Sequence, residues 1–295
     1  MIAIGSRGSA LALWQADHVR SRLEGLGHEV TIRVITTTGD RLLDRRLAAV
    51  GGKGAFLKEI EEELQGGAVD LAVHSLKDVP VALPEGLQLC AILERADPRD
   101  ALLSAGPRLD ELPPGARVGT TSLRRQSQVR ALRPDVTLAD LRGNVETRIR
   151  KLRERQYDAI LLALAGLVRL GRQDEATEVL DPERFLPAPG QGAIALECRA
   201  DDAQIRAAVA PLDHAPTAGA VTAERAFLAA LGGGCNVPLG AYARWVTEGL
   251  RLGAFVARAD GSGLVRGERT GAEPEAVGRA LAEDLLSRGA RELLP

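Results

Sequence analysis

Short apolar runs alternate with amphipathic segments over the first two thirds of the chain, which is the pattern of parallel α/β units. The first series predicts strands at 2–4, 30–35 and 71–73, and helices over 10–26 and 56–64. A second series predicts strands ending at 118 and spanning 136–138 and 159–162, with helices over 123–132 and 145–155. Two such series in succession predict two similar lobes with a cleft between them.

The last eighty or so residues have a different pattern, in which a helix over 217–231 leads to alternating segments near 240–246, 250–256 and 263–270. With a closing helix over 274–287, this predicts a small α+β domain with an antiparallel sheet. The segment 187–190 is a candidate hinge, so that the strand 193–197 returns to complete the first lobe's sheet. The predicted domains are therefore 1–95 with 190–212, then 96–189, and finally 213–295.

Composition is that of a globular protein, with 45% hydrophobic and 26% charged residues among 295. Charges interrupt every apolar run, so no membrane span is expected, and no signal peptide is visible, which favours a cytosolic protein. Cys90, Cys198 and Cys235 lie far apart and suggest neither a disulfide framework nor a zinc ribbon. The four histidines show no metal-ligand spacing, so we expect no metal.

Several arginines lie at turns that connect a strand to a helix. Arg7 lies in the turn 5–9, Arg124 and Arg125 lie in 119–125, and Arg142 precedes a helix that carries Arg148. Helix N-termini bind anions, and a guanidinium group grips a carboxylate with two bonds. Any one of these arginines is more readily explained by a surface ion pair. Their grouping at three turns favours a polyanionic ligand.

Three further segments are candidates for chemistry. Asp78 and Lys77 follow the buried strand 71–73, at the strand end where α/β proteins place ligands, although an Asx-type turn before Pro80 also explains them. The glycine-rich segment 51–54 is expected to be a mobile lid tipped by Lys53, and it lacks the spacing of a P-loop. Cys235 lies on a glycine-rich loop, where a thiol is exposed and reactive rather than part of a core.

Seven segments of the chain, taken together, resemble the porphobilinogen deaminase family. They are 9–16, 50–54, 73–80, 119–125, 141–144, 189–192 and 233–240, and they follow one another in order along nearly the whole chain. The resemblance implies an α/β fold in which two lobes are like those of a type II periplasmic binding protein, followed by the small C-terminal α+β domain. It also implies a monomer.

The same resemblance implies a dipyrromethane cofactor, assembled from substrate and joined by a thioether to Cys235. Asp78 would be the catalytic carboxylate in the stepwise deaminating condensation of four porphobilinogen molecules, after which hydrolysis releases hydroxymethylbilane. The remaining residues that it implies for the cofactor are Ser75, Lys77, Ser122, Arg124, Arg125 and Gly143. Those that it implies for the substrate are Arg7, Ser9, Lys53, Phe56, Arg142, Arg148, Arg169 and Gln191.

Two other functions compete with this interpretation. A non-catalytic, two-lobed module that binds an organic anion explains the arginines equally well, but it does not predict a reactive cysteine on a third domain. A nucleic-acid binder built on Arg124–Arg125 and the segment 148–151 is disfavoured by the net charge of −2, by an aromatic content of 3% and by the lack of a known binding motif.

Overall fold

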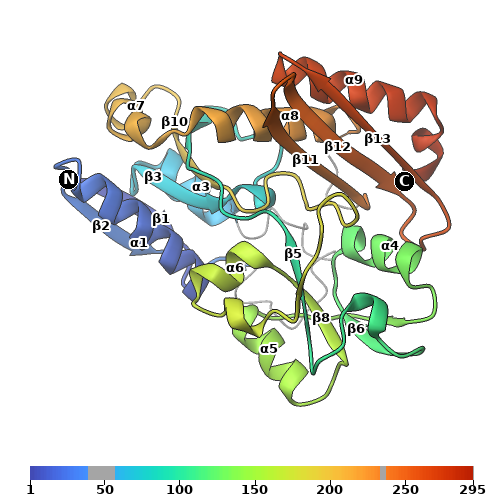
Figure 1. Ribbon diagram of the computed structural model, residues 1–295. Helices are drawn as coiled ribbons and strands as arrows, with labels where there is room; N and C mark the ends of the chain where they lie inside the picture. The colour runs from blue at the N-terminus through green and yellow to red at the C-terminus, as the bar shows by residue number, and fades with distance from the viewer. Residues whose placement is uncertain (39–56, 233–236, 295) are drawn as a thin grey trace. The chain divides into compact units, whose positions relative to one another are not determined.

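The computed structural model describes residues 1–38, 57–232 and 237–294 (Figure 1). The chain divides into two compact units, Met1–Ala96 with Gly192–Ala218 and Asp97–Gln191 with Gly219–Pro295. It therefore passes from one unit to the other three times, at Ala96–Asp97, at Gln191–Gly192 and at Ala218–Gly219. The cleft and the three-domain division stay predictions.

The first unit is built on a five-stranded sheet with the order β2-β1-β3-β10-β4. Its strands are β1 (Ile2–Ser6), β2 (Val30–Val34), β3 (Leu71–Ser75), β4 (Leu87–Ile92) and β10 (Ile194–Arg199). Its helices are α1 (Ala10–Glu24), α3 (Lys58–Gln65) and α7 (Ala203–Val209), with short 3-10 turns η3 (Leu76–Asp78) and η6 (Ala210–Leu212). The strand predicted to return to this sheet does so, because β10 lies between β3 and β4.

Apolar residues cover both faces of this sheet, in agreement with the near-continuous hydrophobic runs of its strands. On one face Val19 and Leu23 of α1 join a buried cluster with Leu71 of β3. On the other face Ile60 and Leu64 of α3 share a buried cluster with Ala72, the neighbour of Leu71 in β3. The sheet is therefore a central layer between helices, as the sequence predicts.

The second unit contains another five-stranded sheet, with the order β7-β6-β8-β5-β9. Its strands are β5 (Asp100–Ser104), β6 (Arg117–Gly119), β7 (Thr137–Ala139), β8 (Ala159–Ala163) and β9 (Glu178–Val179). Its helices are α4 (Leu123–Leu132), α5 (Val145–Arg153) and α6 (Leu164–Arg169), with 3-10 turns η4 (Leu109–Glu111) and η5 (Gln173–Glu175). The fourth strand of each sheet is antiparallel to both of its neighbours, so the two sheets share one plan.

Both sheets are thus mixed, whereas the alternating pattern predicts largely parallel ones. The reason is that β5 and β10 do not enter their sheets through a strand–helix–strand crossover, which is the connection that makes neighbouring strands parallel. β10 follows β4 by about a hundred residues in the chain. β5 comes before both of its neighbours, β8 and β9, and is antiparallel to each of them.

The rest of the second unit is an antiparallel sheet of β11 (Leu239–Val246), β12 (Gly249–Ala257) and β13 (Leu264–Gly271), with helix α9 (Pro274–Ser287) and the turn η7 (Ala290–Leu293). It also contains most of helix α8 (Ala215–Ala230), whose start, up to Ala218, belongs to the first unit. The predicted small α+β fold is confirmed. Phe227 of α8 and Leu281 of α9 share one buried cluster with residues of the sheet. Gly278 permits a close helix contact, since a Cβ there would lie 2.3 Å from the carbonyl oxygen of Ala223.

Among the described residues, none of the helices is long and apolar enough to cross a bilayer.

Candidate functional site

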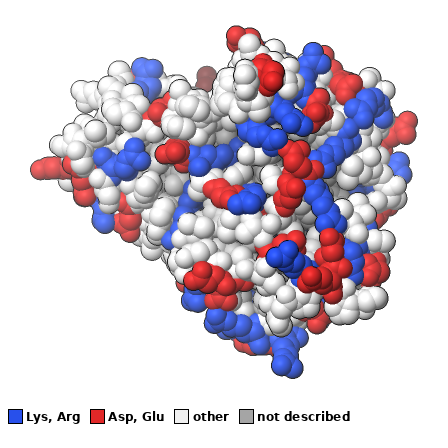
Figure 2. Space-filling model, in the orientation of Figure 1, with Lys and Arg blue, Asp and Glu red and all other residues white. Residues whose placement is uncertain are grey.

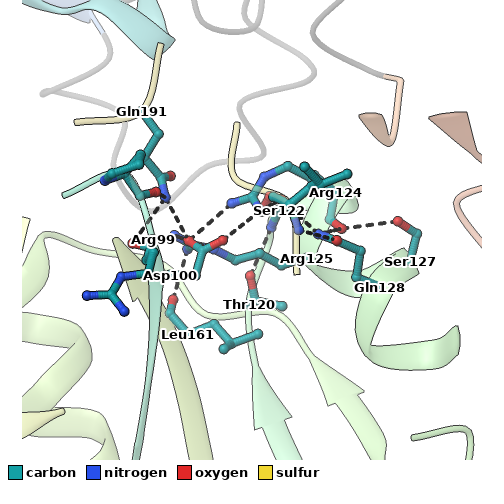
Figure 3. A network of polar contacts seen from close by, with 12 residues as sticks. Arg99, Asp100, Thr120, Ser122, Arg124, Arg125, Ser127, Gln128, Leu161 and Gln191 are labelled. Carbon is teal, nitrogen blue, oxygen red and sulfur yellow. Dashed lines mark hydrogen bonds and ion pairs between the residues drawn. The ribbon is translucent and has the colours of Figure 1, made fainter. Parts of the chain in front are cut away.

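The buried carboxylate of Asp100 forms ion pairs with two adjacent arginines of α4, Arg124 and Arg125 (Figure 3). Arg124 donates from Nη1 to Oδ2 of Asp100 at 2.6 Å and from Nη2 to Oδ1 at 3.2 Å. Arg125 donates to Oδ1 from Nε at 3.0 Å and from Nη2 at 2.6 Å. Each guanidinium group also donates to a main-chain oxygen, Arg124 to Leu186 and Arg125 to Leu161. The two side chains are therefore fixed by several charge-assisted bonds each.

The position of this cluster explains its electrostatics. Both arginines are 6% exposed and Asp100 is fully buried. Burial alone raises the pKa of Asp100, but the charges of Arg124 and Arg125 outweigh it and hold that pKa well below its usual range. Burial lowers the pKa of Arg124, and the charge of Asp100 opposes that change. The carboxylate therefore stays ionised, and the cluster keeps one net positive charge.

Gln191, the last residue of the segment Asp97–Gln191 of the second unit, also bonds to the carboxylate of Asp100. Its Nε2 donates to Oδ1 of Asp100 at 3.0 Å and to the carbonyl oxygen of Pro98 at 2.7 Å. The side chain is 1% exposed. Gln128 of α4 holds the neighbouring segment, since its Oε1 accepts from the backbone N–H of Leu186 at 2.7 Å. Asp100 at the start of β5 and the backbone of Leu186 are thus both bonded to side chains of α4, and Gln191 is bonded to Asp100.

Two donors at the start of α4 are suited to an anion. The buried Nε of Arg124 has no hydrogen-bond partner among the residues that the structure describes. Ser122 is the N-cap of α4, and within the described chain its hydroxyl does not accept from the first turn of the helix. A buried donor without an acceptor is costly, and a helix N-terminus attracts negative charge. A carboxylate at this place would accept from both.

A second anion-binding turn precedes α5. Asn144 caps this helix by accepting from the backbone N–H of Thr147 at 2.8 Å. Gly143 has φ +113°, and a Cβ there would lie 2.6 Å from Cγ2 of Thr147, so glycine is required. Nε of Arg148 donates to the carbonyl oxygen of Gly143 at 2.8 Å. Arg142 and Arg148 are both half-buried.

Arg169 is the last residue of α6, at the end of β8. It is 9% exposed, and burial lowers its pKa to about 10. The guanidinium group therefore remains charged at neutral pH. Strands β6, β7 and β8 are parallel, so the segments with Ser122, Arg142 and Arg169 follow the same edge of the sheet.

In the first unit the predicted residues also follow one sheet edge. Arg7 comes after β1, and Lys77 and Asp78 come after β3, which is parallel to β1. Asp78 ends the 3-10 turn η3 and is half-buried, as are Arg7 and Lys77. The sequence predicts this placement of a carboxylate at the end of a buried strand.

Two polar contacts anchor the strand that leads to Asp78. The hydroxyl of Ser75 accepts from Nε2 of Gln15 in α1 at 2.8 Å. Nε2 of His74 and Oε2 of Glu197 lie 2.8 Å apart in the buried layer between β3 and β10. Ser9 is the N-cap of α1, as predicted, and its hydroxyl accepts from the backbone N–H of Ala12.

Several predicted residues cannot be compared with the structure. Cys235, Lys53 and Phe56 lie outside the described residues. Cys90 and Cys198 are free thiols, and burial raises the pKa of each. They therefore behave as parts of a core, as the sequence predicts, and not as nucleophiles. Within residues 1–38, 57–232 and 237–294, no three His, Cys, Asp or Glu side chains are grouped so that they could hold a metal ion.

On the face drawn in Figure 2, basic and acidic side chains alternate over short distances. Basic and acidic side chains of the surface also pair directly, such as Arg184 with Asp110 and Arg251 with Glu268. The face in Figure 2 therefore lacks the concentrated basic patch that nucleic-acid binding needs.

Comparison with known proteins gives a consistent result over the whole chain. Two family models match, described as "Porphobilinogen deaminase, dipyromethane cofactor binding domain" over residues 2–207 and "Porphobilinogen deaminase, C-terminal domain" over residues 218–287. A curated porphobilinogen deaminase of Syntrophobacter fumaroxidans is 52% identical, with 100% of this chain and 97% of the relative covered. That of Roseiflexus castenholzii is 53% identical, with 99% and 98% covered.

Similar solved structures include two binding proteins. A periplasmic substrate-binding protein of an ABC transporter from Coxiella burnetii is 14% identical, with a TM-score of 0.44, and the match covers 72% of this chain and 92% of that one. The methionine-binding protein MetQ is 12% identical, with a TM-score of 0.46 and coverage of 72% and 89%.

Proposed function

The chain belongs to the porphobilinogen deaminase family, and from that premise we propose how its residues share the work of the reaction. The activity is the stepwise deaminating condensation of porphobilinogen on a bound dipyrromethane, followed by release of hydroxymethylbilane for tetrapyrrole biosynthesis. It is a transferase reaction. The anion-binding module without catalysis is not favoured.

The described residues fit a cofactor that bears several carboxylates. The buried Nε of Arg124 lacks a protein acceptor within the described chain, and the hydroxyl of the N-cap residue Ser122 makes no bond to its helix. Both would be satisfied by a carboxylate oxygen. We propose that these two residues hold the cofactor together with Ser75, Lys77, Arg125 and Gly143, and that Cys235 anchors it through a thioether. When bound, the cofactor supplies the nucleophilic pyrrole carbon on which the chain grows.

Asp78 is our candidate for the catalytic carboxylate. Loss of ammonia from porphobilinogen leaves positive charge on the substrate pyrrole, and the later loss of a proton removes it again. A fixed carboxylate beside the pyrrole N–H stabilises that charge in both transition states more than it stabilises the neutral substrate. The half-buried position of Asp78 at the end of β3 supports this role, because it combines a rigid strand with access for a ligand.

The remaining polar residues would bind the acetate and propionate groups of the substrate and the growing chain. Arg142 and Arg148 support this role best, since both are half-buried beside the N-terminus of α5 and attract anions together with the helix dipole. Arg7, Ser9, Lys53, Phe56, Arg169 and Gln191 complete the proposed substrate set. Each added pyrrole brings two carboxylates, so a protein of net charge −2 needs such local positive charge.

We also propose that the enzyme works in the cytoplasm as a monomer. The free thiols of Cys90 and Cys198 support a reducing compartment. The proposal of a single subunit rests on the family resemblance of the sequence.

The experiment that tests the assignment is an intact mass measurement on the purified protein beside Cys235→Ser. We expect the wild-type mass to exceed the sequence mass by two linked pyrrole units, and we expect the variant to lack that excess. Wild-type protein without the excess would next be mixed with porphobilinogen and measured again. If no pyrrole adduct forms then, the proposed cofactor attachment is wrong.

A further inference from the structure

We propose that Asp100 is a positioning residue, which fixes Arg124 and Arg125 so that a single buried donor of Arg124 faces the carboxylate of the cofactor. The inference rests on the proposed function of these arginines in holding dipyrromethane. Its basis is the set of contacts in Figure 3, where side chains from two segments of the chain converge on one buried carboxylate.

The donors of the arginine pair are almost fully used inside the protein. All three nitrogens of Arg125 donate, Nε and Nη2 to Asp100 and Nη1 to the carbonyl oxygen of Leu161. Both terminal nitrogens of Arg124 donate to Asp100, and Nη1 donates to the carbonyl oxygen of Leu186 as well. Nε of Arg124 is the side-chain nitrogen of the pair that has no partner in the described chain. Asp100 thereby determines which donor is left for a ligand and where it lies.

Asp100 also sets the charge of the cluster. Two adjacent guanidinium groups that are each 6% exposed repel one another, and burial disfavours both charges. One buried carboxylate between them removes most of that repulsion and leaves a net charge of one. A carboxylate of the cofactor would then meet one unit of positive charge held in a fixed place. Without Asp100, the two cations would separate or become solvated, and the donor would lose its direction.

Asp100 lies where the chain enters the second unit, and it is bonded to the residue at which the chain leaves that unit. It is the first residue of β5, which begins soon after the chain enters the second unit at Asp97. Gln191, which donates to the same Oδ1 atom, is the last residue before the chain returns to the first unit. The carboxylate therefore bonds both passages to the start of α4, which carries the arginines.

The test is the rate at which apo-protein gains its cofactor. Apo wild type and Asp100→Asn would be mixed with porphobilinogen, and the fraction with covalent dipyrromethane would be followed by intact mass. We expect the variant to load about tenfold more slowly, since residues in one network couple by this order of free energy. The matched control is Asp110→Asn, which removes an exposed acid that also bonds one arginine twice, Arg184 at 2.5 and 2.7 Å. The control should load at the wild-type rate.

A double variant separates positioning from a general loss of stability. If Asp100 acts through Arg124, then Asp100→Asn should slow loading much less in an Arg124→Gln background than in the wild type. Should Asp100→Asn fail to fold, Gln191→Met provides the second test, because it removes one donor to Asp100 and keeps both ion pairs. We expect it to slow loading by a few-fold and to lower the thermal midpoint slightly, because the carbonyl oxygen of Pro98 also loses a buried donor.

The outcomes of these measurements are distinct. Wild-type protein that never loads would overturn the proposed function itself. Wild type that loads, with Asp100→Asn or Gln191→Met loading at the same rate, would overturn the positioning role alone. Equal slowing by Asp100→Asn in the wild-type and Arg124→Gln backgrounds would also overturn it, because the effect would then not pass through Arg124.

Discussion

Arg124 and Arg148 are chemically identical side chains, and the difference in their burial supports the different roles that we propose for them. Arg124 is held by a buried carboxylate and a carbonyl oxygen, so its orientation is fixed before any ligand binds. Arg148 is half-buried, and its Nε donates to the carbonyl oxygen of Gly143 in the adjacent turn. The first arrangement suits a cofactor that never leaves, and the second suits a chain that lengthens and moves past.

For the proposed catalytic carboxylate, we predict that Asp78→Asn lowers the rate of hydroxymethylbilane formation by about 100-fold or more while the thermal midpoint stays near that of the wild type. The amide keeps the size of the side chain but cannot stabilise positive charge on a pyrrole nitrogen. Glu85→Gln, an exposed acid-to-amide change in the same unit, serves as the control and should keep full activity. Turnover of the Asp78 variant within about a factor of ten of the wild type would contradict the role assigned to this residue.

The sequence identifies the arginines and Asp78 as candidates but does not identify Asp100. A local pattern reveals which residues follow a strand or begin a helix, and that is sufficient for Ser9, Arg124 and Asp78. The ion pairs of Asp100 join residues 24 and 25 positions apart in the chain, and no periodicity reports such a contact. In the sequence, Asp100 stands only at the border between the two predicted series.

Among the helices, α5 begins at a turn that permits one residue only. Gly143 has a positive φ, and an added Cβ would meet the side chain of Thr147. In this conformation the carbonyl oxygen of Gly143 accepts from Nε of Arg148. The capping bond from Asn144 then starts the helix immediately after the turn. The beginning of the helix and the orientation of its arginine therefore depend on the same glycine.

At this scale we predict that Gly143→Ala lowers the free energy of unfolding by about 2–3 kcal/mol, since the new Cβ both strains the backbone and meets Thr147. The control is Gly171→Ala, where φ is +64° but a Cβ would meet nothing within 4 Å. Only the backbone preference acts there, so the loss should be about 1 kcal/mol. Chemical denaturation of both variants measures the difference. Equal losses would show that the contact with Thr147 is relieved at no cost.

The elements themselves differ in how well the sequence predicts them. The helix over 274–287 and the helix over 123–132 have the predicted bounds, because each begins at a clear signal, Pro274 in the first turn of one and Ser122 as the N-cap of the other. Strands β4, β5 and β9 are missing from the prediction. They are short or lie in the fourth and fifth positions of a sheet, where pairing with distant segments and not local periodicity determines the strand.

At the scale of the molecule, each buried cluster among the described residues is made of residues from a single unit. The buried clusters around Leu71 and around Ile60 consist of residues from the first unit. The cluster around Phe227 consists of residues from the second unit. Since a cooperative unit is one that shares a core, each unit is expected to unfold as a unit of its own.

We therefore predict two unfolding transitions by calorimetry rather than one. Leu71→Ala should lower the first unit's stability by about 2–5 kcal/mol, and Phe227→Ala should lower the second unit's by about 3–5 kcal/mol. Each change should displace one transition and leave the other in place. A single transition that both variants displace equally would show that the units unfold together.

The position of β10 bears on the order in which the chain becomes structured as the ribosome produces it. In the first unit, β3 and β4 both pair with β10, which is synthesised about a hundred residues after β4. The five-stranded sheet of the second unit, by contrast, is encoded without interruption between Asp100 and Val179. Domains fold as their residues emerge during synthesis. The later sheet can therefore be complete while the earlier one still lacks a strand, so that the nascent N-terminal segment stays exposed to chaperones for the time needed to translate the middle of the protein.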